Sequence, residues 1–332
     1  MNKPKIAIIG AGISGLILAN QLKEIAEIEI FEKARGCSGR MSSRYKENFC
    51  FDFGAQFFTA RTTEFKEFLS KLSEKNIVKK WYGRFVEIDK NIITFSRQWQ
   101  EDPAHYVAVP RMNELCKFLA IGFNIKFQTR ISKIIHKKNN VSVVDEENNI
   151  YENFNLVIVT TPAQQALDLI PSNLEFYEKI KDYKMVGCYS LMLGFNEALP
   201  INWDIAYLKN SKLSWIASEN SKPNRQPSFA YTVLSRNAWA ENNMERNIEE
   251  VKTELINELE YVIDNNLPKI IHSDIHRWRY ANISKQKGPK FYYDPENKIA
   301  ICGDWLIQGR IESAFQSAFY LSKEIIANTI ST

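Results

Sequence analysis

The feature that most constrains this chain is a glycine-rich turn near its start, Gly10-Ala11-Gly12-Ile13-Ser14-Gly15. The turn follows the apolar run Lys5–Ile9 and opens the segment Ser14–Ala26, whose apolar residues recur at helical spacing. A second apolar run, Ile28–Phe31, ends at Glu32. A G-x-G-x-x-G pattern alone is weak evidence, but between a strand and a helix, with an acidic residue after the second strand, it indicates a dinucleotide-binding βαβ unit.

Each glycine of this pattern, and the acidic residue after it, has a physical reason. Gly10 permits the tight turn, and Gly15 lets the helix pack closely on the strand. Gly12 has no side chain, so the backbone and the positive end of the helix that begins near Ser14 can approach a pyrophosphate. Glu32 is expected to accept hydrogen bonds from the adenosine ribose hydroxyls and to repel a 2′-phosphate, which disfavours NADP.

The bulk properties restrict the environment and the partners of the chain. The net charge is +4, and the Lys and Arg residues are interleaved with Asp and Glu, which does not favour nucleic acid. The basic and apolar start resembles a secretory signal, but its glycines and its continuation into an amphipathic helix argue against one, and it is shorter than the about 20 apolar residues that span a membrane. We therefore expect no membrane partner. The five cysteines form no C-x-x-C pair, so we expect a cytoplasmic protein whose cysteines are reduced.

Histidines four apart are the strongest candidate for a metal site. His272 and His276 have this spacing, but the stretch Lys269–Arg279 is typical of a strand and has no cysteine or third histidine nearby. We therefore expect no metal.

Helical spacing predicts helices over Thr63–Glu74 and Arg111–Ala120, and an apolar run predicts a buried strand over Leu156–Val159. The order of the predicted elements gives the fold class. The first segments and the last ones, the buried run Ile299–Cys302 and the helix Ile311–Ile330, belong together in one parallel sheet, whereas Val186–Ser235 reads as several strands of another. We predict an α/β chain with a Rossmann-type domain and an inserted α+β substrate domain with a mostly antiparallel sheet. The expected ranges are 1–75, 125–165 and 290–332 for the Rossmann-type domain, and 76–124 and 166–289 for the substrate domain.

Several segments along the chain resemble one protein family. Glu32–Met41 resembles the E-K…G-G-R-M stretch of flavin-containing amine oxidase-type proteins. Four further segments are similar, in the same order, to motifs of the renalase-like branch of that family: Phe51–Thr59, Val157–Ala166, His276–Ala281 and Gly303–Ala314.

The resemblance implies a two-domain FAD oxidoreductase that acts on a small molecule. Resembling members oxidise dihydronicotinamide isomers whose hydride sits at the wrong ring carbon, and O2 then reoxidises the FAD with release of H2O2. The resemblance places Arg40 along the cofactor, Asp304 at its ribityl-pyrophosphate region, and the helix start near Glu312 and Ala314 at the flavin. The cofactor contacts that we expect are Gly10, Gly12, Ser14, Gly15, Glu32, Lys33, Gly39, Arg40, Met41, Ala55, Gln56, Ile131, Gly303, Asp304, Arg310, Ile311, Glu312 and Ala314.

The chain departs from the family pattern at a few positions. Ser38 replaces the first glycine of the G-G-R doublet, Ser313 and Ala318 replace two glycines near the last helix, and Arg111 stands where the family has glycine. FAD binding remains the expectation, and these changes leave the identity of the substrate open.

The predicted chemistry is hydride transfer from a substrate that binds beside the flavin. The sequence has one dinucleotide fingerprint and no redox cysteine pair, which argues against NAD(P)H-driven monooxygenases and disulfide reductases. Hydride transfer needs positioning and exclusion of water more than a strong base. Candidate catalytic residues are Gln56, Phe57, Trp278 and Arg279. Phe57 could instead be core, and Arg279 could hold a substrate phosphate or form a surface ion pair.

Other functions remain open at this point. A flavin amine oxidase would show an aromatic cage and a lysine-held water, for which the sequence identifies no lysine. A non-catalytic FAD-binding protein would stay oxidised with every donor, and a plain NAD dehydrogenase would purify colourless. The oligomeric state is not indicated by the sequence.

Overall fold

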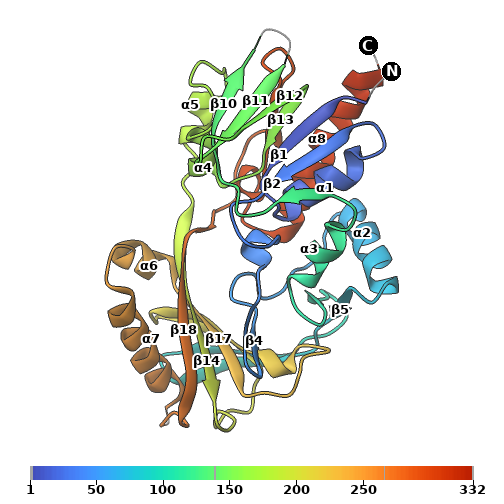
Figure 1. Cartoon of the computed structure of the whole chain (residues 1–332). Helices are drawn as coiled ribbons and strands as arrows, with labels where there is room; N and C mark the ends of the chain where they lie inside the picture. Colours follow the sequence, from blue (N-terminus) through green and yellow to red (C-terminus); the bar gives the residue numbers. More distant parts are fainter. Residues whose placement is uncertain (1–2, 138–139, 265, 331–332) are drawn as a thin grey trace. The chain divides into compact units, whose positions relative to one another are not determined.

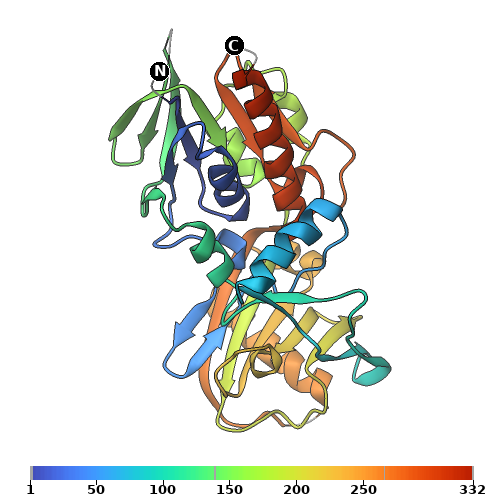
Figure 2. The ribbon, with the colours of Figure 1, turned by 90° about the vertical axis from the view of Figure 1, so that its right-hand side faces the viewer.

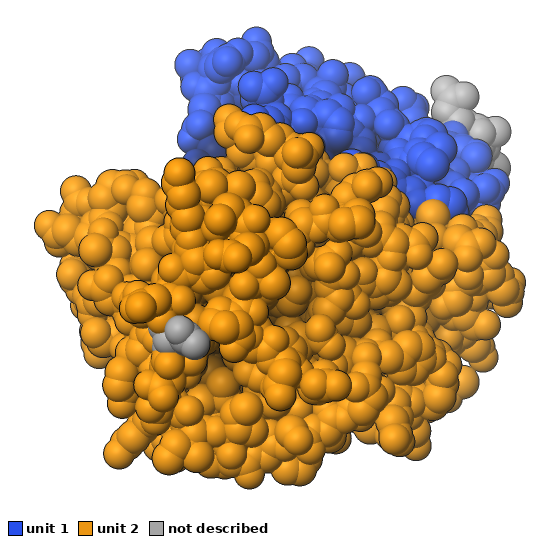
Figure 3. All heavy atoms as spheres, turned by 90° about the horizontal axis from the view of Figure 1, so that it is seen from below, with its two compact units in different colours: residues 1–40, 116–185, 282–332 blue, residues 41–115, 186–281 orange. Residues whose placement is uncertain are grey.

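The computed structural model describes residues 3–137, 140–264 and 266–330. The chain forms two compact units, which Figure 3 colours by residue range. Unit 1 comprises residues 1–40, 116–185 and 282–332, and unit 2 comprises residues 41–115 and 186–281.

Unit 1 is built on a six-stranded sheet in the order β19-β20-β13-β1-β2-β9. The strands are parallel except for β19, which pairs antiparallel with β20. The inner strands are short, apolar and rich in β-branched residues, which suits a sheet that is covered on both faces. Their bounds are β1 Lys5–Ile9, β2 Glu27–Phe31, β9 Asn124–Lys126, β13 Leu156–Val159, β19 Phe291–Asp294 and β20 Ile299–Cys302.

Helices α1 (Ile13–Leu22) and α8 (Ile311–Ile330) lie side by side against this sheet in both views (Figures 1 and 2). A separate three-stranded antiparallel sheet joins β10 to β12. The other elements that lie in or at the border of unit 1 are η1 Gly39–Met41, α3 Glu114–Leu119, β10 Ile131–His136, β11 Val141–Asp145, β12 Ile150–Phe154, α4 Ala163–Leu167, α5 Tyr177–Lys181 and η3 Asp304–Leu306.

Unit 2 contains a seven-stranded sheet in the order β18-β14-β17-β16-β15-β6-β7. Strands β15 and β6 pair parallel, whereas β14 with β17, β17 with β16, β16 with β15, and β6 with β7 pair antiparallel. Two-stranded pairs join β3 to β4 and β5 to β8. The bounds are β3 Arg44–Lys46, β4 Phe49–Phe51, α2 Thr63–Glu74, β5 Val78–Lys80, β6 Arg84–Asp89, β7 Ile92–Gln98, β8 Tyr106–Ala108, β14 Val186–Phe195, β15 Ile205–Lys209, β16 Leu213–Ser218, η2 Glu219–Ser221, β17 Ala230–Ser235, α6 Asn237–Asn243, α7 Ile248–Ile263 and β18 Ile270–Asn282.

Helix α7 shows how local signals and packing agree in unit 2. The Asn247 side chain caps the helix by accepting hydrogen bonds from the N–H groups of Glu249 and Glu250. The residues Val251, Leu255, Leu259 and Val262 lie at helical spacing and are buried in the same core as the large sheet. Figure 1 shows α7 in unit 2, where it contacts strand β16 of the large sheet.

The predicted fold class is confirmed, since a mostly parallel sheet and a mostly antiparallel one form separate units. The helix expected over Arg111–Ala120 is shorter and begins at Glu114, and α6 was not predicted.

The borders between the two units differ from the domain borders that we expected. Residues 41–75 belong to unit 2, where the aromatic rings of Phe49 and Phe51 pack with Met192 and Ala230 of the large sheet. Residues 116–124 and 166–185 belong to unit 1, where β9 extends the parallel sheet.

Candidate functional site

The glycine turn, residues 10–15, has the geometry of a phosphate cradle. Gly10 has φ +111°, and a Cβ there would lie 2.6 Å from the Thr160 hydroxyl. A Cβ on Gly15 would lie 2.1 Å from the Gly10 carbonyl oxygen. A Cβ on Gly12, in contrast, would meet no other part of the described chain within 4 Å, so the turn has open space where a pyrophosphate needs it.

The start of helix α1 supplies donors beside this space. Gly12 is the N-cap residue and provides no side-chain hydrogen bond, and the first turn carries no acidic side chain. The first N–H groups of a helix lack partners within the helix and carry partial positive charge. The turn therefore fits the pyrophosphate of a dinucleotide in both space and charge.

Glu32 is fixed by the backbone at the end of β2. Its side chain is buried, and its two carboxylate oxygens accept hydrogen bonds from the N–H groups of Ala11 and Ala34, both at 2.8 Å. A carboxylate oxygen can accept more than one hydrogen bond, so Glu32 can both brace the glycine turn and accept from a ribose hydroxyl.

The segment after Glu32 returns to the glycine turn. The N–H of Ser38 donates to the carbonyl oxygen of Ala11 at 3.0 Å, and a Cβ on Gly39 would lie 3.7 Å from the Cα of Gly12. Ser38 has φ 116° although it is not glycine, a conformation that costs free energy for a residue with a Cβ. The departure from the family glycine therefore places a Cβ at a position with positive φ and adds strain.

Arg40 and Asp304 form an ion pair within unit 1. Two hydrogen bonds of 2.9 and 2.5 Å join the guanidinium to the carboxylate, whose side chain is 8% exposed. The Ser14 hydroxyl donates to the carbonyl oxygen of Ala314 at 3.2 Å, which connects the starts of α1 and α8. Expected cofactor residues from the first 40 positions and from the end of the chain thus come together.

Other expected cofactor residues have different surroundings. The Lys33 ammonium donates to the Gln165 side chain at 3.0 Å, and burial lowers the pKa of Lys33. Ile131 is a buried residue at the start of β10, and Gly303 donates its N–H to the Ser317 hydroxyl at 2.9 Å. Met41 is buried and belongs to unit 2.

In unit 2, the segment Asp52–Phe57, called here the motif segment, is anchored by a buried ionic cluster. The cluster consists of Asp52, Glu219, Lys222 and Arg225, whose side chains are at most 3% exposed. Lys222 Nζ lies 3.1 Å from Asp52 Oδ2 and 2.8 Å from Glu219 Oε2, and Arg225 Nη2 lies 2.5 Å from Asp52 Oδ2.

The cluster shifts the pKa values of its two acids in opposite directions. Burial alone would raise the pKa of Asp52, but Lys222 and Arg225 outweigh it and hold the pKa well below its usual value. Burial raises the pKa of Glu219, and Lys222 opposes this shift. Asp52 is therefore the charged anchor of the motif segment, and it also accepts hydrogen bonds from the Ser43 hydroxyl and the Met112 N–H.

Gln56 and Phe57 are both enclosed within unit 2. The Gln56 side chain is buried, donates to the carbonyl oxygens of Asp52 and Gly54, and accepts from Lys222. The Phe57 ring is half-buried, and its centroid lies 5.0 to 5.4 Å from the rings of Trp99, His105 and Trp215. Ala55 is half-buried between these anchored neighbours.

Trp278 and Arg279 on β18 differ in environment. The indole of Trp278 donates to the Phe53 carbonyl oxygen at 2.8 Å and stacks on the Phe53 ring. Arg279 forms an exposed ion pair with Glu245. This is the surface ion pair that we named from the sequence as the alternative to a contact with a substrate phosphate. His276 lies against Phe53 and Trp278, and burial lowers its pKa to about 4.

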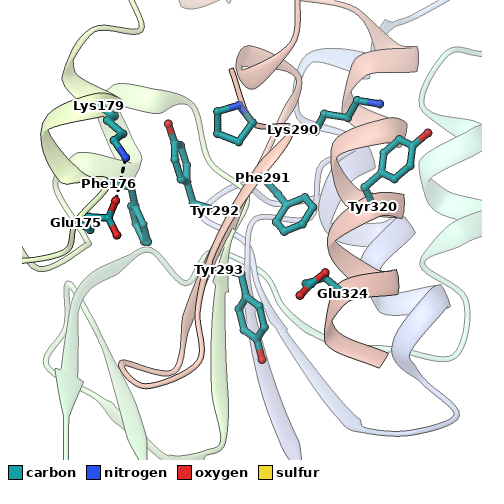
Figure 4. A pocket seen from close by; sticks show the side chains of 10 residues that line it. Glu175, Phe176, Lys179, Lys290, Phe291, Tyr292, Tyr293, Tyr320 and Glu324 are labelled. Carbon is teal, nitrogen blue, oxygen red and sulfur yellow. Dashed lines mark hydrogen bonds and ion pairs between the residues drawn. The ribbon is translucent and has the colours of Figure 1, made fainter. Parts of the chain in front are cut away.

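An open groove of about 720 Å³ lies along edge strand β19 (Figure 4). Its aromatic walls come from β19, from α8 and from the segment before α5, and no residue expected at the cofactor or the substrate lines it. Across the residues that the structure describes, no cluster of three potential metal ligands occurs and no helix has the length and apolar character to cross a bilayer.

Glu219, Lys222 and Arg225 were not predicted as part of a site from the sequence. They belong to a stretch rich in Lys, Pro, Asn and Arg, which is typical of a solvated loop. The signal that could have found them is Asp52, because an acidic residue between Phe51 and Phe53 needs a buried cation if the strand is core.

Comparisons with known proteins agree with this geometry. Residues 8–72 match the NAD(P)-binding Rossmann-like domain, and residues 77–326 match the flavin containing amine oxidoreductase family, which is more than half of the chain. Renalase of Mus musculus is 23% identical over 303 residues, covering 84% of this chain and 85% of that protein.

Solved structures show the same fold at low identity. A protein of Exiguobacterium sp. 255-15, proposed to be a protoporphyrinogen oxidase, has a TM-score of 0.80 at 10% identity, covering 98% of this chain and 99% of that one. A putrescine oxidase bound to putrescine has a TM-score of 0.72 at 10% identity with the same coverage. The chain therefore belongs to the flavin containing amine oxidoreductase family and is an FAD-dependent oxidoreductase.

Proposed function

We propose that this protein is an oxidase that takes a hydride from an isomeric dihydronicotinamide dinucleotide. The observation that carries the proposal is the renalase-like set of motifs, in order along the chain, together with the similarity to mouse renalase over 84% of the chain. Bound FAD would supply the hydride acceptor, and O2 would reoxidise it with release of H2O2.

Unit 1 would hold the cofactor. The N–H groups at Gly12 and the start of α1 would bind the pyrophosphate, and Glu32 would accept from the adenosine ribose. Asp304, oriented by Arg40, would accept from the ribityl hydroxyls. The first N–H groups of α8, near Glu312 and Ala314, would favour negative charge on the flavin ring.

The histidines of unit 2 favour a substrate that loses no proton. Burial, with Arg97 and Arg44 nearby, lowers the pKa of His105 and of His276 to about 4. Both imidazoles are therefore neutral near neutral pH, and neither changes charge there. A dihydronicotinamide gives up a hydride without a base, which fits these residues.

The amine oxidase alternative needs a lysine that holds a water. Lys222 is buried in unit 2, and its ammonium, which has three donors, contacts the side-chain oxygens of Asp52, Glu219 and Gln56. Its donors are used within the protein, so Lys222 does not fit that role.

The two functions differ in their dependence on pH. The FAD-loaded protein is mixed anaerobically with dihydronicotinamide isomers or with small amines, and loss of the oxidised flavin absorbance is followed from about pH 6 to about pH 8. We expect reduction by a dihydronicotinamide isomer at a rate that changes by less than about threefold over this range, because the imidazoles of His105 and His276 stay neutral throughout it. Reduction by amines alone, with a rate that rises with pH as the amine loses its proton, would refute the proposal.

A further inference from the structure

We propose that Lys222 is a positioning residue that acts through Gln56 to set the shape of the motif segment. In this arrangement the backbone and small side chains of Gly54 and Ala55, rather than the Gln56 amide, are the part of the segment that remains available to a ligand. The inference rests on the proposed function and on the motif-based expectation that Ala55 and Gln56 contact the cofactor.

The orientation of the Gln56 amide is dictated by Lys222. An ammonium has donors and no acceptor, so the atom 3.3 Å from Lys222 Nζ must be the amide oxygen. The amide nitrogen is then left facing the carbonyl oxygens of Asp52 and Gly54, to which it donates. These bonds close a ring around the backbone between Asp52 and Gln56.

The position of the Lys222 side chain is itself fixed by its contacts. Its side chain is fully buried, and Asp52 and Glu219 fix the ammonium from two sides at 3.1 and 2.8 Å. Glu219 is fixed in turn by the Thr232 hydroxyl at 2.6 Å and by the Asp52 N–H at 3.2 Å. The position of the ammonium is therefore determined by residues far apart in sequence that meet only in the folded unit.

The side chains of Gln56 and Phe57, which follow Gly54 and Ala55, both have partners within unit 2. Gln56 is used by the ring of hydrogen bonds, and Phe57 is enclosed by Trp99, His105 and Trp215. Gly54 and Ala55 are half-buried and carry no bulky side chain. A close approach of a flat ring system to this short stretch requires that its backbone be held in one conformation.

The test measures the limiting rate of anaerobic flavin reduction in the FAD-loaded protein for four forms. These are wild type, Gln56→Leu, the double variant Glu219→Gln with Lys222→Met, and the triple variant that combines them. The double variant removes one cation and one acid, so Asp52 and Arg225 remain as a matched buried pair. We therefore expect it to melt within several degrees of wild type, whereas Lys222→Met alone leaves buried acids unmatched and melts much lower.

We expect Gln56→Leu and the double variant each to slow flavin reduction by about tenfold or more, and the triple variant to be slowed no further. Such non-additivity shows that the Glu219–Lys222 pair acts through Gln56, and Glu219→Gln alone, which keeps Lys222 beside Gln56, should be slowed less. If the double variant reduces as fast as wild type, or if the effects multiply in the triple variant, Gln56 does not depend on Lys222 and the proposal is wrong.

Lys212→Met is the matched control. Lys212 also lies between two acids, Glu254 at 2.9 Å and Glu258 at 3.9 Å, but its side chain is 41% exposed and its contacts do not include Gln56. We expect unchanged flavin reduction in this variant. If dihydronicotinamides fail to reduce wild type, the proposed function fails, and the same comparison is then made with whichever donor reduces wild type.

Discussion

The glycine turn of unit 1 and the motif segment of unit 2 are shaped by different kinds of interaction. The turn depends on backbone geometry: the Gly10 N–H donates to the Phe31 carbonyl oxygen, and Gly15 packs on the Gly10 carbonyl. The motif segment depends on buried side-chain charges from residues more than 160 positions away. A side chain added to the glycine turn should therefore prevent ligand binding by steric conflict. Loss of a charge from the buried ionic cluster should instead lower the stability of the protein.

The largest expected effect is that Gly12→Val abolishes FAD retention. A valine side chain would extend into the open space that the pyrophosphate needs, whereas no other part of the described chain lies within 4 Å of a Cβ at this position. We expect a colourless protein whose FAD-free form melts like FAD-free wild type. Gly15→Ala is the contrasting control, because its Cβ would lie 2.1 Å from a backbone oxygen and should lower the melting temperature as well. A yellow, fully loaded Gly12→Val protein would refute the cradle.

Asp52→Asn should lower the free energy of unfolding by about 3–5 kcal/mol, because Arg225 and Lys222 are buried and lose the charged acid that they share. The control is Asp274→Asn, which breaks a partly exposed pair with Arg44 and should cost about 0–1 kcal/mol. Denaturant unfolding of both variants with FAD present measures the difference. Equal small losses would show that the cluster does not hold the motif segment.

Glu32→Ala should weaken FAD binding by roughly 1–3 kcal/mol, as for the loss of a charge-assisted hydrogen bond. The variant also frees the N–H groups of Ala11 and Ala34. Glu32→Gln keeps one acceptor oxygen at nearly the same place and should lose less. Titration of the FAD-free proteins with FAD measures both affinities, and an unchanged affinity in Glu32→Ala would remove Glu32 from the site.

The smallest expected effect is a gain. Ser38→Gly should stabilise the protein by about 1 kcal/mol, because glycine adopts φ 116° without the strain that serine carries. Ser38→Ala is the control, since it removes the hydroxyl but keeps the Cβ and should show no gain. A loss of stability in Ser38→Gly, measured by denaturant unfolding, would mean that the hydroxyl contributes more than the strain costs.

Local patterns predicted a large part of the fold. The bounds expected for the strands Lys5–Ile9, Leu156–Val159 and Ile299–Cys302 and for the helices Thr63–Glu74 and Ile311–Ile330 match the structure. These segments have strong periodicity and clear ends, so short-range preference and burial agree. The helix near Arg111 starts three residues late, where local pattern alone sets boundaries poorly.

The amino-acid sequence was sufficient to identify the glycine turn and its acidic partner Glu32, because glycine spacing controls backbone shape over a few residues. Folding was needed to reveal that Lys222 and Arg225 are buried beside Asp52, since their own stretch reads as a solvated loop. The physical reason is that backbone conformation is a local property, whereas the burial of a charge depends on which distant charge meets it.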